Sequence, residues 1–352
     1  MSAANQLIDQ SPSKRSATIH DVAALAGVSI ATVSRVINRT SHVSAPVTAR
    51  VQAAIGTLQF VPHAAARVLA TKKTNTIGLI LPEISGFYFS PLLHGIEEGI
   101  RQHGFDLLVH TTMSSQATSE KPTQKLGEHN TDGLLIYTAS IGHDEILRLR
   151  QRGFPIVLLL QSTPADLEIP SVIIENKSGA LKVINHLIDH HGRRRIAFLA
   201  GPENEEDSYW REQGYRAALS SHGIPIDPNL ISIGGFDTAI AQKSVSEWIS
   251  RGIQMDAIFT GDDDSAIGAI TALQSTDLRV PEDIAIVGFD DIYISQYLSP
   301  PLTTVRVPIE LAGFTAAQQL IHIINQEPVE RRVLLPTELI IRRSCGCLYP
   351  KY

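Results

Sequence analysis

Two clusters of acidic residues follow apolar runs in the second half of the chain. GDDDSAIGAI (261–270) carries Asp262, Asp263 and Asp264, and VGFDD (287–291) carries Asp290 and Asp291. Clustered carboxylates can bind Mg²⁺, act as an acid–base pair or accept hydrogen bonds from ligand hydroxyl groups. The sequence contains no Gly-Lys-Ser/Thr phosphate loop, no HExxH and no Gly-x-Ser-x-Gly elbow. We therefore expect no enzyme activity and predict no catalytic residue.

A second functional surface is predicted near the N-terminus, in TIHDVAALAGVSIATVSRVIN (18–38). Thr18 can cap a helix with Asp21 in the capping-box position, and Gly27 can end it. Ser29 can cap a second helix that runs to about Asn38. Its inward stripe is Val33, Val36 and Ile37, and its other face carries Ile30, Ala31, Ser34, Arg35 and Asn38. Such groups can read base edges in a major groove, although an ordinary helical hairpin would show the same spacing.

The elements that must position the acidic clusters alternate between strands and helices. Apolar runs of strand length occur at 77–81, 105–109, 133–137, 156–160, 172–174, 196–200, 230–233, 257–260 and 284–289. Helical stretches separate them at 91–103, 144–151, 179–190, 210–222, 240–251 and 264–273. Strands buried on both faces read as continuous apolar runs, so two doubly wound parallel βα units in tandem are predicted. Near the N-terminus, Ser44 and Pro46 predict a third short helix.

The pattern AT-I-HDVA-x-LAGVS-x-ATVSRV-IN at 17–38 resembles the opening of the lactose/galactose repressor (LacI/GalR) family of bacterial transcription regulators. The resemblance continues through SHVS (41–44) and FVPHAAARVLATKKTNTIGLI (60–80), and ordered, weaker matches run to the C-terminus. It implies an all-α helix-turn-helix headpiece followed by an α/β two-lobed body like that of periplasmic binding proteins. It also implies a homodimeric regulator, more often a repressor, that binds double-stranded operator DNA and a small effector.

The resemblance implies a set of DNA contacts. The residues expected to contact phosphates are Ser29, Thr32, Ser34 and His42, and those expected to read bases are Ile30, Ala31 and Arg35, with Thr18 and Asn38 also at the interface. HAAARVLA (63–70) matches the family's hinge helix, in which Leu69 would wedge into the minor groove and His63, Ala66 and Arg67 would lie beside it. A linker helix packed on its own protein is the alternative.

For the effector, the resemblance implies a site between the lobes. The expected residues are Tyr88, Phe89, Trp210, Arg211, Asp262 and Asp290, whereas Asp263 and Asp264 are expected to cap the following helix. Aromatic rings stack on sugars or bases, and the fork of Arg211 suits neighbouring oxygens. Gly86-Phe87, Glu175 and HHGRRRIAF (190–198) depart from the family pattern. A sugar or sugar derivative is favoured, a purine-type co-repressor is the alternative, and a sugar-binding receptor without DNA function is the alternative from another class.

These expectations divide the chain into segments. They are a disordered tail (1–17), a headpiece (18–62), a hinge helix and linker (63–76), an effector-binding and dimerisation domain (77–345) and a second tail (346–352). Within the effector domain, the first lobe is expected at about 77–175 and 306–336, and the second at about 176–305 and 337–345. The short segment after Arg343 leads us to expect a dimer rather than a tetramer.

Charge is distributed unevenly along the chain, whose formal net charge is −6. Residues 1–76 carry eight basic and two acidic side chains, and the remainder carries 22 basic and 34 acidic ones. A basic head on an acidic body directs phosphates to the head. With no long apolar run and no secretory signal pattern, we expect a cytoplasmic protein without membrane contact.

Cofactors and metals are not expected from the sequence. The two cysteines, Cys345 and Cys347, cannot complete a structural zinc site alone. We therefore expect a reduced, exposed pair, and we expect the histidines of 190–198 to be solvated or capping residues.

Overall fold

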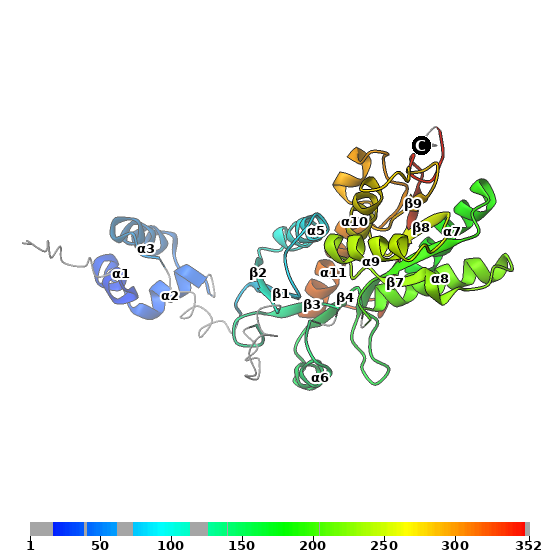
Figure 1. Cartoon of the computed structure of the whole chain (residues 1–352). Coiled ribbons are helices and arrows are strands. Elements are labelled where there is room, and N and C mark those ends of the chain that lie inside the picture. The colour runs from blue at the N-terminus through cyan, green and yellow to red at the C-terminus, as the bar shows by residue number, and fades with distance from the viewer. Residues whose placement is uncertain are drawn as a thin grey trace, which may run out of the picture. The chain divides into compact units, whose positions relative to one another are not determined.

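The computed structural model describes residues 17–38, 41–61, 73–112, 126–138, 140–203 and 205–348 (Figure 1). The chain divides into two compact units, Met1–Thr74 and Asn75–Tyr352. Within the described ranges no single helix is long and apolar enough to cross a membrane, and one bent pair, Ile19–Ala26 with Ile30–Asn38, qualifies by length and composition only. The expected N-terminal tail, except its last residue, and residues 349–352 of the expected C-terminal tail lie outside the described residues.

The first unit begins with helix α1 (Ile19–Ala26), and its sequence determines both ends. The Thr18 hydroxyl accepts a hydrogen bond from the backbone N–H of Asp21, and the Asp21 carboxylate accepts one from the Thr18 N–H at 2.8 Å. This reciprocal capping satisfies two backbone donors that a helix leaves without partners. Gly27, with φ of 63°, ends the helix in the left-handed region. Both predicted ends are confirmed.

Helices α2 (Ile30–Asn38) and α3 (Ala45–Leu58) complete a small apolar core with α1. Ser29 caps α2, because its Oγ accepts from the Thr32 N–H at 3.2 Å. Val33 is completely buried, and the rest of the predicted inward stripe is half-buried. Ser44 occupies the cap position of α3, but its side chain makes no capping hydrogen bond, so that predicted cap is correct in position only. The core residues are Val22, Ala23, Ala26, Val33, Val51, Ala54 and Phe60.

The second unit contains two parallel sheets, as predicted. The larger sheet has the order β11-β5-β4-β3-β1-β2 and the smaller has β7-β6-β8-β9. The larger comprises β1 (Thr76–Leu81), β2 (Asp106–Thr111), β3 (Gly133–Tyr137), β4 (Ile156–Leu159), β5 (Ser171–Ile174) and β11 (Arg332–Leu335). The smaller comprises β6 (Ile196–Ala200), β7 (Ile231–Ile233), β8 (Ala257–Thr260) and β9 (Ala285–Val287). Each strand predicted between residues 77 and 289 is present, with ends within two residues of the prediction.

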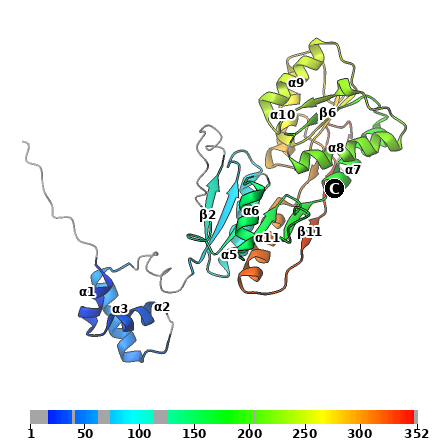
Figure 2. The same cartoon turned by 90° about the horizontal axis from the view of Figure 1, so that it is seen from below.

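Helices cover both sheets and define two lobes (Figure 2). The first lobe is the larger sheet with α5 (Phe89–Arg101), α6 (His143–Gln151) and α11 (Ile309–Ile324). The second lobe is the smaller sheet with α7 (Asn176–His191), α8 (Glu206–Ser221), α9 (Thr238–Ser250) and α10 (Asp263–Gln274). This covering explains the apolar strands, because parallel sheets are normally buried on both faces.

The sequence patterns predicted no individual element after residue 289, where the structure has η3 (Tyr293–Tyr297), β10, α11, β11 and β12. Helix α11 packs closely against α5, and a Cβ on Gly313 would collide with the backbone oxygen of Leu92. Strands β10 (Thr304–Arg306) and β12 (Glu338–Ile340) form an antiparallel pair. The chain therefore passes between the lobes three times, between β5 and α7, at β10 and at β12.

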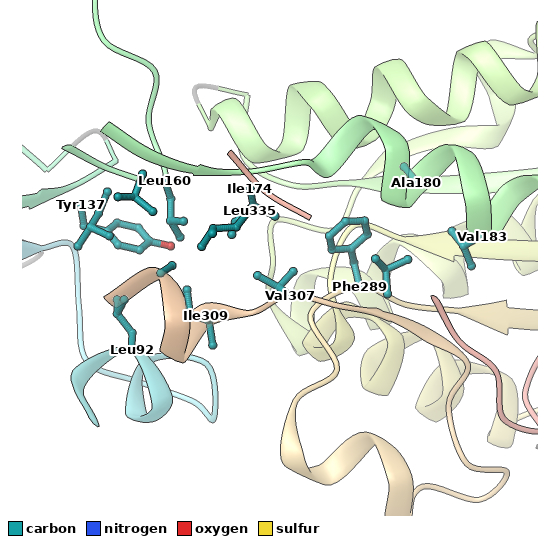
Figure 3. Packing of buried hydrophobic residues seen from close by; sticks show 14 of the residues in the cluster. Leu92, Tyr137, Leu160, Ile174, Ala180, Val183, Phe289, Val307, Ile309 and Leu335 are labelled. Atoms are coloured by element: carbon teal, nitrogen blue, oxygen red, sulfur yellow. The ribbon is translucent and has the colours of Figure 1, made fainter. Parts of the chain in front are cut away.

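The largest apolar core is continuous from one lobe to the other (Figure 3). Leu92 and Tyr137 belong to the first lobe, and Ala180 and Val183 belong to α7 of the second. Between them lies a group of buried side chains next to the crossing segments: Ile174, Phe289, Val307, Ile309 and Leu335. The connection between the lobes is thus a packed region.

Candidate nucleic-acid interface and ligand cleft

The outer face of α2 presents the side chains expected to read bases. Ile30 is 40% exposed, and Ala31 and Arg35 are also exposed. Arg35 has no carboxylate partner among the residues that the structure describes, so its guanidinium is available to another molecule. The groups expected at phosphates lie on or next to this helix, with Ser29 and His42 exposed and Thr32 and Ser34 half-buried.

Several polar groups of this face are held in place locally. Ser29 Oγ lies 2.9 Å from Thr32 Oγ1, and Asn38 Nδ2 donates to Ser34 Oγ at 3.2 Å. Thr18 remains exposed, but its hydroxyl donates to the Asp21 carboxylate at 2.7 Å. Of the other residues expected at DNA, His63, Ala66, Arg67 and Leu69 lie outside the described residues.

In the second unit, Arg211 on α8 is at the centre of a buried polar network. Its side chain is almost completely buried, and its Nε donates to Asn176 Oδ1 at 2.9 Å. Its Nη1 donates to the carbonyl oxygen of Gly261 at 2.6 Å, and its Nη2 lies 3.0 Å from Asp290 Oδ1. Asn176 also donates to Asp207 Oδ1 at 2.7 Å. We call Arg211, Asn176, Asp207 and Asp290 the Arg211 network.

The network lies where parallel strands end. Asn176 follows β5, Gly261 and Asp262 follow β8, and Asp290 follows β9. In open α/β folds, ligands bind outside the carboxyl ends of the strands. Aromatic rings hold the guanidinium, since Arg211 Cζ is 4.0 Å from the ring centroid of Phe289 and 5.3 Å from that of Phe236. Asp207 was not predicted, although its position one turn before Arg211 on α8 places both side chains on one face.

Burial makes the carboxyl groups around Arg211 hard to ionise. It raises the pKa of Asp207 to about 6, although Arg211 opposes this shift. Burial, with a further contribution from the charge of Asp290, raises the pKa of Asp262 to about 7. The pKa of Asp290 is raised by burial as well, against the effect of Arg211. Hydroxyl groups that donate to these oxygens would favour their charged forms, so the site suits a ligand rich in hydroxyls.

The backbone at Asp290 is strained. Asp290 has φ of 104° and Asp291 has φ of 57°, a region that non-glycine residues rarely adopt. The conformation is held by the Asp290 N–H, which donates to the Val305 oxygen at 2.7 Å, and by Arg342, which donates to Asp291 Oδ1 at 2.6 Å. No donor in the described ranges makes a well-aligned hydrogen bond to Asp290 Oδ1. Strain of this kind often accompanies a functional site.

The three consecutive aspartates have different roles, and the expected assignment was wrong in part. Asp262, expected only in the cleft, is itself the cap of α10 and accepts from the Ser265 N–H at 3.0 Å. Asp263, expected as a cap, is completely buried and accepts from Ser295 Oγ at 2.5 Å and Thr304 Oγ1 at 2.6 Å. The cap of α10 is thus one residue earlier than expected, and Asp263 instead connects the helix to the segments after β9.

The expected ligand residues do not all line one cavity. Tyr88 and Asp290 line a hollow of about 580 Å³ between the lobes, whereas Trp210 lines a separate hollow of about 200 Å³ with Asn176 and Asp207. Trp210 Nε1 donates to Glu206 Oε1 at 3.0 Å. Phe89 packs between Tyr88 and Tyr137, with both ring centroid distances at 5.5 Å. The Arg211 network lies among all of these residues.

The cysteines contradict the expectation of an exposed pair. Cys345 is completely buried and Cys347 is half-buried, and both lie beside His186 and His191 of α7. The expectation of no metal rested on the two thiols alone, and the structure adds two imidazoles from the helix that packs against them. No pattern in the sequence indicated this juxtaposition, since about 150 residues separate the two pairs.

Comparison with known proteins matches both units. The model of bacterial regulatory proteins of the lacI family matches residues 18–63, and that of the periplasmic binding protein-like domain matches residues 184–345. The ribose operon repressor of Escherichia coli K12 is 34% identical over 93% of this chain and 99% of its own length. The HTH-type transcriptional repressor PurR of Aliivibrio salmonicida is 32% identical over 93% and 98%.

Two solved structures are similar along most of the chain. The Lac repressor dimer bound to operator and the anti-inducer ONPF is 27% identical, with a TM-score of 0.80 over 94% of this chain and 99% of that one. The complex of the transcriptional regulator CelR with cellobiose is 30% identical, with a TM-score of 0.67 over 93% and 99%.

Proposed function

Because this chain belongs to the lacI family of bacterial regulatory proteins, we propose that it represses transcription as a dimer on a pseudo-palindromic operator and responds to a sugar or sugar derivative. The family consists of DNA-binding regulators, and this chain is an effector-responsive regulator of that kind. Its proposed place of action is the cytoplasm, and no catalytic step is assigned to it. The proposal rests on one combination: an exposed polar face on α2 and a buried Arg211 network at strand ends, in the same chain.

The DNA half of the proposal assigns base reading to the exposed face of α2. Arg35 is the one cation on this helix, and a bidentate contact to guanine O6 and N7 is the commonest specific contact that arginine makes. Ile30 and Ala31 would make apolar contacts such as those with a thymine methyl group. Ser29, Thr32, Ser34 and His42 would contact phosphates and so set orientation rather than sequence.

The ligand half assigns the effector to the space around the Arg211 network. Three carboxyl groups and one guanidinium supply mainly acceptors, and a polyhydroxyl ligand supplies donors in return. Tyr88 would provide a ring face next to Asp290. The complex of CelR with cellobiose and the name of the ribose operon repressor support a sugar as the ligand. Because the chain is also similar to PurR, a purine is the second class of ligand that the experiment below includes.

Ligand and operator would be linked through the two lobes. A ligand that binds one arrangement of the lobes more tightly than another changes operator affinity, and the operator must change ligand affinity by the same factor. A coupling free energy of about 1–3 kcal/mol corresponds to a change of roughly 5- to 150-fold. Equal ligand affinity with and without operator would contradict this linkage.

The first experiment is selection of bound duplexes from a random-sequence pool, using the full chain without added ligand. We expect enrichment of an inverted repeat. If nothing is enriched, the selection is repeated with a purine pool and a sugar pool, and enrichment only with purines would replace the sugar proposal. Failure in all three conditions would contradict DNA binding by the headpiece.

Matched variants then test the assignment of Arg35. Arg35→Ala should weaken binding to the selected duplex by roughly 5- to 150-fold, following the ~1–3 kcal/mol value of a bidentate base contact, and should relax preference at one base pair. Arg50, exposed on α3 of the same headpiece, provides the control Arg50→Ala, which removes an equal charge. Equal losses in both variants would show that Arg35 contributes charge only.

A further inference from the structure

Four side chains of metal-binding type converge where the C-terminal segment meets the end of α7. His186 and His191 come from the last two turns of the helix, and Cys345 and Cys347 come from the segment after β12. The ligand atoms of all four residues lie within 4.8 Å of one another. His186 and Cys345 are buried, and His191 and Cys347 are half-buried.

The distances within this cluster match tetrahedral coordination. His186 Nε2 lies 3.4 Å from Cys345 Sγ and 3.7 Å from Cys347 Sγ, and His191 Nε2 lies 3.4 Å from Cys347 Sγ. Around Zn²⁺, bonds of about 2.3 Å to sulfur and about 2.0 Å to nitrogen place neighbouring ligand atoms about 3.6 Å apart. One nitrogen of His186 thus faces both sulfurs at the spacing that a shared ion requires.

The segment that carries the cysteines is held in place by hydrogen bonds outside the cluster. Ser344, which is completely buried, donates from its hydroxyl to the Ile286 oxygen at 2.6 Å and accepts from the Thr303 N–H at 2.7 Å. Gly346, between the two cysteines, has φ of 110°, and a Cβ there would lie 3.2 Å from His191 Nδ1. A glycine between the cysteines therefore lets both sulfurs turn toward the helix.

The surroundings of Cys345 suit a metal-bound thiolate. Thr303 Oγ1 donates to Cys345 Sγ at 3.1 Å, the kind of hydrogen bond that orients a metal ligand and stabilises a thiolate. Two thiolates and one Zn²⁺ sum to zero charge, so the filled site buries no net charge.

We propose that His186, His191, Cys345 and Cys347 bind one Zn²⁺ ion in a closed tetrahedral site. Two nitrogen and two sulfur ligands are typical of zinc, and four protein ligands leave no position for a substrate, so the role is structural. The ion joins the end of α7 to the segment that follows β12. Strand β12 is one of the three places where the chain passes between the lobes. The site adds a property to the regulator and does not depend on which effector binds.

The test is zinc uptake by the full chain under reducing conditions after removal of metals by a chelator. A zinc titration against a chromophoric competitor should show one tight equivalent per chain, and cobalt should give the absorption bands of a tetrahedral ion with thiolate ligands. Zinc should also raise the thermal unfolding temperature. Absence of a tight equivalent, or a cobalt spectrum without thiolate bands, would overturn the proposal.

Variants identify the ligands. Cys347→Ser and His191→Gln change half-buried residues, and each should weaken zinc binding by at least 100-fold and remove the zinc-dependent rise in unfolding temperature. His190→Gln is the matched control, because His190 is exposed on the same helix and is not one of the four ligands. Thr303→Ala should weaken zinc binding by about 10-fold through the lost hydrogen bond. Unchanged zinc binding in both ligand variants would overturn the assignment.

Discussion

Replacement of Asp262 by asparagine is expected to stabilise the protein and to impair its response to ligand. Asparagine caps a helix as well as aspartate does, so the hydrogen bond from the Ser265 N–H can be kept. The amide does not ionise. The folded variant therefore loses no unfolding free energy to a buried carboxyl group, which must either keep its proton above its ordinary pKa or bury a charge. Stability and function should change in opposite directions.

The size of the effect follows from the pKa of Asp262, which burial raises from 3.8 to about 7. A shift of about three units, at about 1.4 kcal/mol each, corresponds to roughly 4 kcal/mol of unfolding free energy. Below about pH 3 the group is protonated in both states, and the wild type carries no penalty. As pH rises from 4 to 7 the unfolded chain ionises while the folded chain retains its proton, so the advantage of Asp262→Asn should grow and then level off above pH 7.

The assay is urea unfolding of both proteins at pH 4, 6 and 8, with ligand-dependent release from the selected duplex measured alongside. Asp283→Asn is the control of opposite sign, because a hydrogen bond from Arg279 lowers the pKa of this exposed carboxyl group. We expect that variant to lose a little stability at neutral pH. An advantage of Asp262→Asn that is equal at pH 4 and pH 8, or a net loss at pH 8, would refute the reasoning.

Three further substitutions follow from the structure. Arg211→Lys should lower the unfolding free energy by about 3 kcal/mol, because lysine leaves Asp290 and Asn176 without their guanidinium partner. The control Arg216→Lys, on the surface of the same helix, should change it by less than about 1 kcal/mol. Similar losses in both variants would show that the Arg211 network does not stabilise the fold more than a surface ion pair does. Gly313→Ala should lower the unfolding free energy by about 1–3 kcal/mol, because the added Cβ forces α5 and α11 apart. The control Gly56→Ala, where a Cβ has open space in α3, should raise it by up to about 1 kcal/mol, and thermal unfolding measures both changes. Gly27→Ala should destabilise the headpiece by about 1–2 kcal/mol, because the φ of Gly27 is 63° and alanine rarely adopts that conformation. Unfolding followed by circular dichroism measures the loss, and an unchanged midpoint would mean that the turn can relax.

Local patterns predicted most of the fold. A few neighbouring residues were enough to predict the start of α1, from the capping pair Thr18 and Asp21, and the strands β1 to β9, from their apolar runs. Helix α11 was not predicted because it packs against both α5 and the larger sheet, so its sequence lacks a clear polar face. Strands β10 and β12 have three residues each, too few to show alternation.

The candidate site was predicted less completely than the fold. Arg211 and Asp290 were identified, and the structure brings them within 3.0 Å. The cap of α10 was expected one residue too late, because the order of Asp262 and Asp263 along the chain does not show which carboxylate the distant Thr304 will contact. For the same reason, nothing near Cys345 in the sequence indicated His186, whose position depends on how α7 meets the C-terminal segment.

The continuous apolar core through the crossing segments limits how the lobes can move. Ile174, Val307 and Leu335 are buried among side chains of both lobes, and close-packed side chains cannot slide by small amounts without losing contacts. A change in lobe angle must exchange one packed arrangement for another. At an intermediate ligand concentration, a population of these molecules would therefore contain two distinct forms, and no molecule would be half open.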